Sequence, residues 1–124
     1  LSGGHQHPFV VPSAKNRVRA AKADAMVAEN QYLTQKATTE SLVSQLYKAQ
    51  DKTLKSLRYY EEAALPLAEE QLTTAELANK EGEIDYISYI TILNSAINIK
   101  INHLDFINQY NQQAIEIQYQ LGNL

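Results

Sequence analysis

The stretch Ala78-Asn79-Lys80-Glu81-Gly82-Glu83-Ile84-Asp85-Tyr86-Ile87 decides the fold of this chain. It contains the only glycine between Gly4 and Gly122, and a long segment with helical periodicity lies on each side of it. Glycine readily adopts the left-handed conformation that ends a helix, and Asp85 can cap a second helix with its side-chain oxygen. A connection this short makes the two helices antiparallel. The sequence therefore predicts a helical hairpin whose tip, residues 81–85, is centred on Gly82.

The composition favours narrow helix–helix packing over a thick globular core. The chain has 124 residues, enough for one domain, and is 44% hydrophobic, with no tryptophan and two phenylalanines. Its net charge of −3 gives no indication of a polyanionic partner, and the absence of cysteine excludes disulfides and thiolate chemistry. No apolar run approaches the roughly 20 residues that a membrane-spanning helix needs.

The first helix is predicted to begin at Pro12 or Ser13, because both residues suit a helix start, and to continue to the tip without a glycine. Residues 1–12 contain two glycines and two prolines, and we expect a flexible segment with a possible strand stub at 9–11. A seven-residue pattern along the first helix predicts a coiled-coil-like seam. Its members are Val18, Ala21, Ala25, Ala28, Tyr32, Leu42, Leu46, Ala49, Tyr60, Ala63 and Leu67.

Pro66 is the one residue that challenges a continuous first helix. It lacks a backbone donor, and its ring crowds the carbonyl of Glu62. A break at Leu65-Pro66 would give a three-helix bundle. No turn residues accompany the proline, so we expect a kink within one long helix.

The second predicted helix, from about Tyr86 to Leu121, carries two apolar stripes. One contains Tyr86, Ile90, Leu93, Ile97, Ile101, Leu104, Ile107, Tyr110, Ala114, Ile117 and Leu121; the other contains Tyr89, Ile92, Ala96, Ile99 and Phe106. A two-helix hairpin buries only one side of each helix. The second helix, about 54 Å long, is also too short to cover the first. The sequence therefore predicts that further helices, from other copies or from more chain, cover the apolar surface that the hairpin leaves exposed.

Catalytic and metal-binding patterns are weak in this sequence. His5 and His7 form a short metal-like pair near the start, and His103 stands alone in the second helix, where we expect a seam or surface residue. The acidic residues lack the Glu-x-x-His companion of a di-metal bundle, and no phosphate loop or nucleophile elbow occurs. We expect no enzyme activity and no metal site or other cofactor. A metal-binding bundle that uses the three histidines is the least favoured alternative.

An ordered set of residues resembles a known family. Tyr59-Tyr60-Glu61-Glu62-Ala63-Ala64-Leu65-Pro66-Leu67-Ala68-Glu69, then Ala75 and Ala78, then Gly82-Glu83-Ile84-Asp85-Tyr86 and the closing Gln120-Leu121-Gly122 resemble the last helical hairpin of TolC-like outer membrane efflux proteins. The likeness is greatest to the heavy-metal CusC- and CzcC-like branch, and extends to the related segment fused behind CusA/CzcA-type transporters. It covers about residues 12–122.

The resemblance implies a function and a set of partners. Such proteins are trimers whose outer-membrane barrel continues into a periplasmic tunnel of packed helices, fed by an inner-membrane RND pump through a periplasmic adaptor. It implies that residues 13–124 are a periplasmic hairpin, a passive conduit element and a piece of a longer channel. Gly82, Glu83, Ile84 and Asp85 would form the adaptor-docking tip.

By the same resemblance Ser88 and Thr91 would lie near the channel constriction. Some members of that family have acidic residues at this constriction, whereas Ser88 and Thr91 carry hydroxyl groups. This difference argues against cation gating by a ring of these residues. The alternative to the whole assignment is a free-standing coiled-coil adaptor or scaffold protein that dimerises through the Val18–Tyr32 part of the seam.

Overall fold

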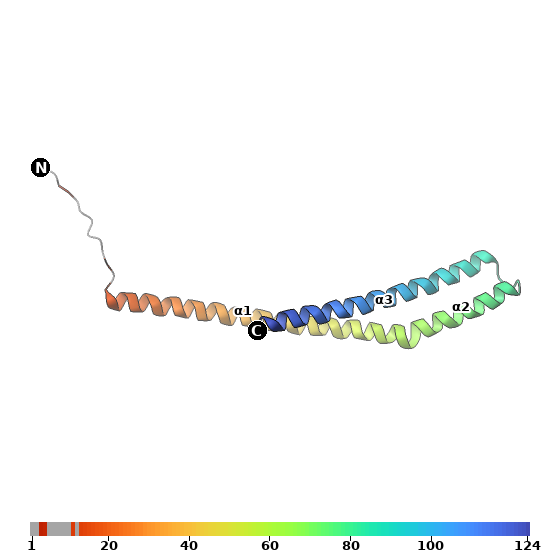
Figure 1. Ribbon diagram of the computed structural model, residues 1–124, viewed down its shortest axis with the longest axis horizontal. Coiled ribbons are helices and arrows are strands. Elements are labelled where there is room, and N and C mark those ends of the chain that lie inside the picture. The colour runs from red at the N-terminus through yellow and green to blue at the C-terminus, as the bar shows by residue number, and fades with distance from the viewer. Residues whose placement is uncertain (1–2, 5–10, 12) are drawn as a thin grey trace. The chain divides into compact units, whose positions relative to one another are not determined.

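The computed structural model describes residues 3–4, 11 and 13–124. Within them the order of elements is α1 (Ala14–Tyr59), the π-helix η1 (Tyr60–Ala64), α2 (Leu65–Lys80) and α3 (Tyr86–Gly122), shown in Figure 1. No strand occurs in this described part of the chain. The predicted all-α hairpin, one very long helix followed by a shorter return helix, is confirmed. The predicted strand stub falls largely on Phe9 and Val10, which lie outside the described residues, as do His5 and His7.

The chain divides into two units, Leu1–Thr38 and Thr39–Leu124. In the first unit, Ser13 caps α1: its Oγ accepts from the backbone nitrogen of Asn16 at 3.2 Å. Every residue from 13 to 38 is exposed. Val18, Ala21, Ala25, Ala28 and Tyr32, here called the alanine seam, thus lie on an exposed helix face. A helix with such a face gains stability when another helix covers it.

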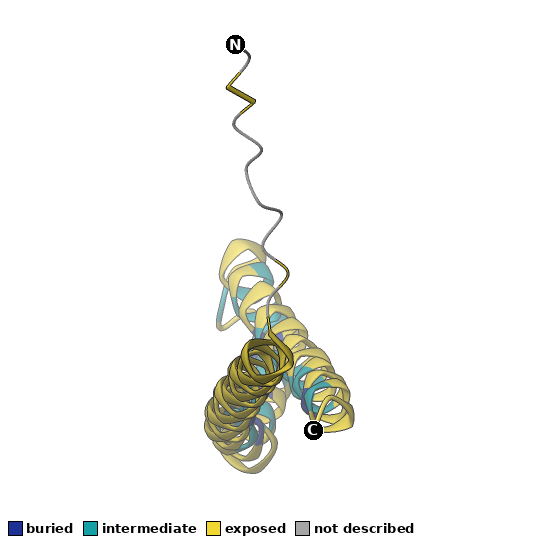
Figure 2. Cartoon of the chain, turned by 90° about the vertical axis from the view of Figure 1, so that its left-hand side faces the viewer, coloured by how far each residue is buried: buried dark blue, intermediate teal, exposed yellow. Residues whose placement is uncertain are grey.

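In the second unit α3 runs antiparallel to the helix before the tip. Two side-chain contacts join them: His103 Nε2 lies 3.2 Å from Glu61 Oε1, and Lys100 Nζ lies 2.7 Å from Glu69 Oε1. The core between the helices is thin, and most of the ribbon in Figure 2 is coloured as exposed. The buried residues are Val43, Thr53, Leu57, Ala68, Ala75, Ala96 and Ile117.

The helices approach most closely near the tip. Cα atoms of α2 and α3 come within 8 Å of each other, whereas within the second unit no Cα atom of residues 39–59 of α1 comes that close to α3. Small residues explain the difference, because Ala68, Ala75 and Ala96 let two backbones approach. Between α1 and α3 the larger side chains of Leu57 and Ile117 hold the helices apart.

Pro66 bends the long helix but does not break it. The backbone N–H of Leu65 donates to the carbonyl of Tyr60, five residues earlier, so one π-helical segment directly precedes the proline. The wider π turn gives the proline ring room beside the carbonyl of Glu62, with which it would collide in a regular α-helix. Figure 1 shows the bend where η1 joins α2. The kink interpretation is confirmed, and the three-helix bundle is wrong.

The π-helix also changes which residues face α3. The buried and half-buried positions of the long helix also include Leu54, Ser56, Leu65, Ala78 and Asn79, but one continuous row among them is regular. Its members are Thr39, Val43, Leu46, Gln50, Thr53, Leu57, Tyr60, Ala64, Ala68, Leu72 and Ala75. They alternate steps of four and three up to Tyr60, and then take three successive steps of four to Leu72. The heptad thus contains one extra residue, and η1 is the segment that accommodates it.

The predicted seam is therefore partly wrong between Leu42 and Leu67. Leu46 and Tyr60 face α3 as predicted, but Leu42, Ala49, Ala63 and Leu67 are exposed. Leu42, Ala63 and Leu67 each stand next to another apolar residue, Val43, Ala64 or Ala68, that turns inward instead. A strict heptad pattern does not predict which of two neighbouring apolar residues is buried. It also does not predict the extra residue in η1.

The two stripes of α3 differ in burial. Tyr89, Ile92, Ala96, Ile99 and Phe106 are all buried or half-buried. The longer stripe turns outward in its middle, where Ile97, Ile101 and Leu104 are 44%, 48% and 62% exposed. These three residues are here called the exposed stripe. The hairpin covers one side of α3 and leaves this stripe open, as expected for a helix with two apolar sides.

Candidate functional site

The tip is built by a helix-ending motif at Gly82. The backbone N–H of Glu83 donates to the carbonyl of Ala78 at 2.8 Å, and that of Gly82 donates to Asn79 at 3.2 Å. This pair of bonds is the Schellman arrangement, which satisfies the last carbonyls of a helix. It requires a left-handed residue, and Gly82 has φ +75°. The predicted tip glycine is thus placed as its sequence context indicated.

Replacing Gly82 tests the tip directly. We expect Gly82→Ala to lower the free energy of unfolding by about 1 kcal/mol, because an L-residue is strained in the left-handed region. A methyl group there would meet no atom within 4 Å, so the cost is one of backbone conformation. Chemical denaturation followed by circular dichroism measures it. Gly82→Asn should cost less and Gly122→Ala almost nothing; equal losses in all three variants would contradict this account.

Asp85 begins α3. Its Oδ1 accepts from the backbone nitrogen of Ser88 at 2.7 Å, and its carbonyl accepts from the nitrogen of Tyr89 at 3.1 Å. Hydrogen bonds from the Ser88 side chain, and next from its backbone, lower the pKa of Asp85 below its ordinary value of 3.8. The carboxylate therefore stabilises the folded hairpin when it is ionised.

This cap gives the hairpin a dependence on acid pH. Because the pKa of Asp85 is lower in the folded chain, its stabilisation is present above the ordinary value and is lost as the pH falls through the lower, folded value. We expect Asp85→Asn, which retains a capping oxygen, to lose part of the difference in melting temperature between about pH 6 and about pH 2. Thermal unfolding at both pH values is the measurement. An unchanged difference would show that Asp85 does not contribute.

The surface of the tip combines acidic and apolar side chains. Glu81, Glu83 and Asp85 are exposed, and Ile84 is half-buried. Beside them Tyr86 and Ile87 are 68% and 75% exposed. The tip therefore presents two exposed apolar side chains next to three carboxylates.

The two predicted constriction residues follow the tip in α3, where both are exposed. The hydroxyl of Thr91 donates to the carbonyl of Ile87 at 2.9 Å. Ser88 bonds to Asp85, so it belongs to the helix cap. The fold thus brings Ser88 together with the tip residues, and leaves Thr91 one turn further along the helix.

A cluster around η1 was not anticipated from the sequence. The ring of Tyr60 lies 5.3 Å from that of Phe106, measured between centroids, and His103 reaches Glu61 beside them. One signal could have revealed the contact between them: Glu61 and His103 are equidistant from Gly82 along the chain. No group of three potential metal ligands is found in the described part of the chain.

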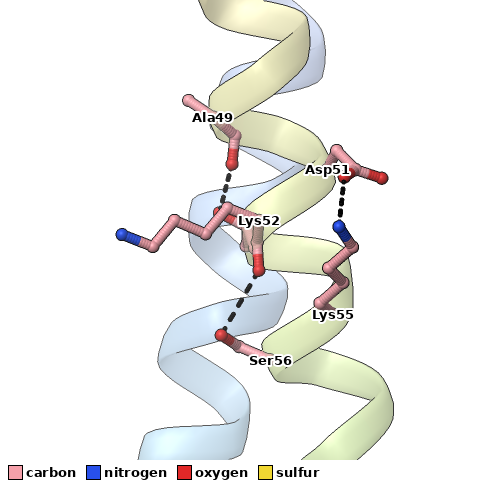
Figure 3. A network of polar contacts seen from close by, with 6 residues as sticks. Ala49, Asp51, Lys52, Lys55 and Ser56 are labelled. Carbon is pink, nitrogen blue, oxygen red and sulfur yellow. Dashed lines mark hydrogen bonds and ion pairs between the residues drawn. The ribbon is translucent and has the colours of Figure 1, made fainter.

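A groove of about 200 Å³ lies between α1 and α3. Its lining residues are Ala49, Lys52, Thr53, Ser56, Phe106, Gln109 and Gln113. Both hydroxyls on the α1 side already donate hydrogen bonds. The hydroxyl of Thr53 donates to the carbonyl of Ala49 at 3.1 Å. The hydroxyl of Ser56 donates to the carbonyl of Lys52 at 3.3 Å (Figure 3). The buried Oε1 of Gln113 has no protein partner. A water molecule in the groove would satisfy it.

Comparisons with known proteins give no further assignment. No protein-family model, curated protein or solved structure matches this chain. None of the helices in the described ranges combines the length and hydropathy needed to cross a lipid bilayer.

Proposed function

We propose that this chain is a periplasmic helical hairpin from a TolC-like channel of a tripartite heavy-metal efflux system. It is a wall element: it packs beside other hairpins and encloses a conduit, without catalytic groups. The channel type and the transported class come from the resemblance of Tyr59–Glu69, Gly82–Tyr86 and Gln120–Gly122 to that family.

The observation that supports the proposal most is the exposed stripe on α3. Ile97, Ile101 and Leu104 remain about half exposed although α3 already packs on the long helix. Lys100 lies on the same side of α3, but its ammonium group is drawn to Glu69 of α2 at 2.7 Å. The stripe is therefore an apolar surface suited to a neighbouring helix.

The tip supports the partner assignment. In this proposal Gly82, Glu83, Ile84 and Asp85 meet the periplasmic adaptor, which connects to the inner-membrane RND pump. The Schellman motif and the Asp85 cap give this contact a defined backbone. Ser88 and Thr91 lie near the constriction formed by neighbouring hairpins of a homotrimer.

The proposal predicts separable effects on assembly and stability. In the parent protein, Ile101→Asp with Leu104→Asp should abolish oligomer formation and metal tolerance, because two charges would have to be buried between helices. In the 124-residue chain each change should alter the free energy of unfolding by less than about 0.5 kcal/mol, because both sites are exposed. Native gel electrophoresis of membrane extracts, growth on metal salts and chemical denaturation provide the three readouts.

Asn98→Asp is the matched control, because it adds a charge to an exposed position of the same helix. It should leave assembly and tolerance unchanged. A parent protein found in the cytosol, or one whose deletion leaves metal tolerance intact, would rule out the efflux function.

A further inference from the structure

The first turns of α1 carry an unusual concentration of positive charge. Lys15, Arg19 and Lys22 are spaced i, i+4 and i+7, so they lie on one side of the helix, here called the cationic face. All three are exposed, and no ion pair in the described ranges includes any of them. Like charges at this spacing repel each other, and a helix N-terminus disfavours cations. An external anion would relieve both penalties.

The cationic face is distinct from the alanine seam. Successive residues of an α-helix are rotated by about 100°, which places the seam at Val18, Ala21 and Ala25 roughly a quarter turn from the three cations. A neighbouring helix can therefore pack on the seam while the cationic face stays open. Met26, 63% exposed, continues the same side one turn after Lys22. Met26 thus separates the three cations from Glu29, the next charged residue on this side of the helix.

We propose that the cationic face binds the phosphate groups of an anionic phospholipid surface. Lys and Arg can extend their charged ends toward phosphates while their alkyl stems and Met26 contact the apolar boundary of the headgroup layer. A nucleic acid fits less well, because residues 13–31 contain no aromatic side chain to stack on bases. This inference is independent of the efflux proposal and holds for any protein that contains this helix.

The test is flotation of the 124-residue chain with lipid vesicles. The wild-type chain should bind vesicles of phosphatidylcholine and phosphatidylglycerol in equal parts, and bind pure phosphatidylcholine far less. Each cation near an anionic surface strengthens partitioning about fivefold, so Lys15→Gln, Arg19→Gln and Lys22→Gln together should weaken it about a hundredfold. Added salt should also weaken it.

The chain offers a matched control with the same spacing and the same change in charge. Lys48, Lys52 and Lys55 also stand at i, i+4 and i+7, but Asp51 lies among them, with its carboxylate 3.0 Å from the ammonium of Lys55 (Figure 3). Replacing these three lysines by glutamine should reduce vesicle binding much less. An equal reduction would mean that net charge alone matters, and would overturn the proposal.

Equal binding of the wild-type chain to both kinds of vesicle, or binding to neither, would also overturn it. Sedimentation velocity without lipid identifies the competing partner. A salt-sensitive dimer that the first triple variant abolishes, without vesicle binding, would show that the cationic face binds a second copy of the chain, and would overturn the proposal. Circular dichroism confirms that each variant is helical.

Discussion

Leu57→Ala is expected to lower the free energy of unfolding by about 2–3 kcal/mol. Leu57 is 8% exposed and lies on the side of α1 that faces α3, three residues before the π-helix begins at Tyr60. The change removes buried apolar surface and leaves a cavity that a two-helix interface can only partly close. Few residues of the second unit are buried as deeply, so the loss is a large fraction of its stability. Urea denaturation followed by circular dichroism measures it.

Leu67→Ala is the matched control. It removes the same atoms, but Leu67 is 54% exposed, so we expect a loss below about 0.5 kcal/mol. A strict heptad assigns Leu67 to the seam, whereas the π-helix turns Ala68 inward in its place. Equal losses of stability at Leu57 and Leu67 would therefore contradict the claim that η1 accommodates one extra residue and turns Ala68 toward α3.

The second large effect is expected from single-residue deletions that shift the helix register. In a Pro66→Ala background, deletion of Ala63 should convert η1 to regular α-helix and leave the buried residues on both sides of it facing α3. Deletion of Thr74 in α2 should instead rotate the residues on one side of it by about 100°. Because this turns either Leu72 or Ala75 away from α3, we expect a loss of more than about 2 kcal/mol.

Denaturation of the two deletion variants and of Pro66→Ala gives the comparison. Hydrogen exchange locates the change, since the Thr74 deletion should reduce protection mainly in α2 and the facing turns of α3. If removal of Ala63 is as damaging as removal of Thr74, the π-helix does not accommodate an extra residue.

Local chemistry made the hairpin predictable. Gly82 and Asp85 each act through a backbone conformation or a side-chain bond to a residue a few positions away, so the turn and both flanking helix ends follow from the sequence around them. The kink at Pro66 is also local, because the ring and the carbonyl of Glu62 belong to adjacent turns.

The facing residues could be predicted only in part. Leu42 and Val43, or Leu67 and Ala68, are both apolar, and only the position of the opposite helix decides which one is buried. The contact of Glu61 with His103 likewise depends on the antiparallel register. Which neighbour is buried depends on tertiary packing, and the hydrophobic periodicity of one helix does not predict it.

The exposed stripe supports the central claim, that this hairpin is one part of a larger helical wall. The most direct test is the reactivity of Ile101→Cys toward a maleimide, in a chain that contains no other cysteine. Labelling should be fast in the 124-residue chain, where this position is about half exposed, and strongly suppressed in the assembled parent protein. Equally fast labelling in both would show that no neighbouring helix covers the stripe, and would contradict the account.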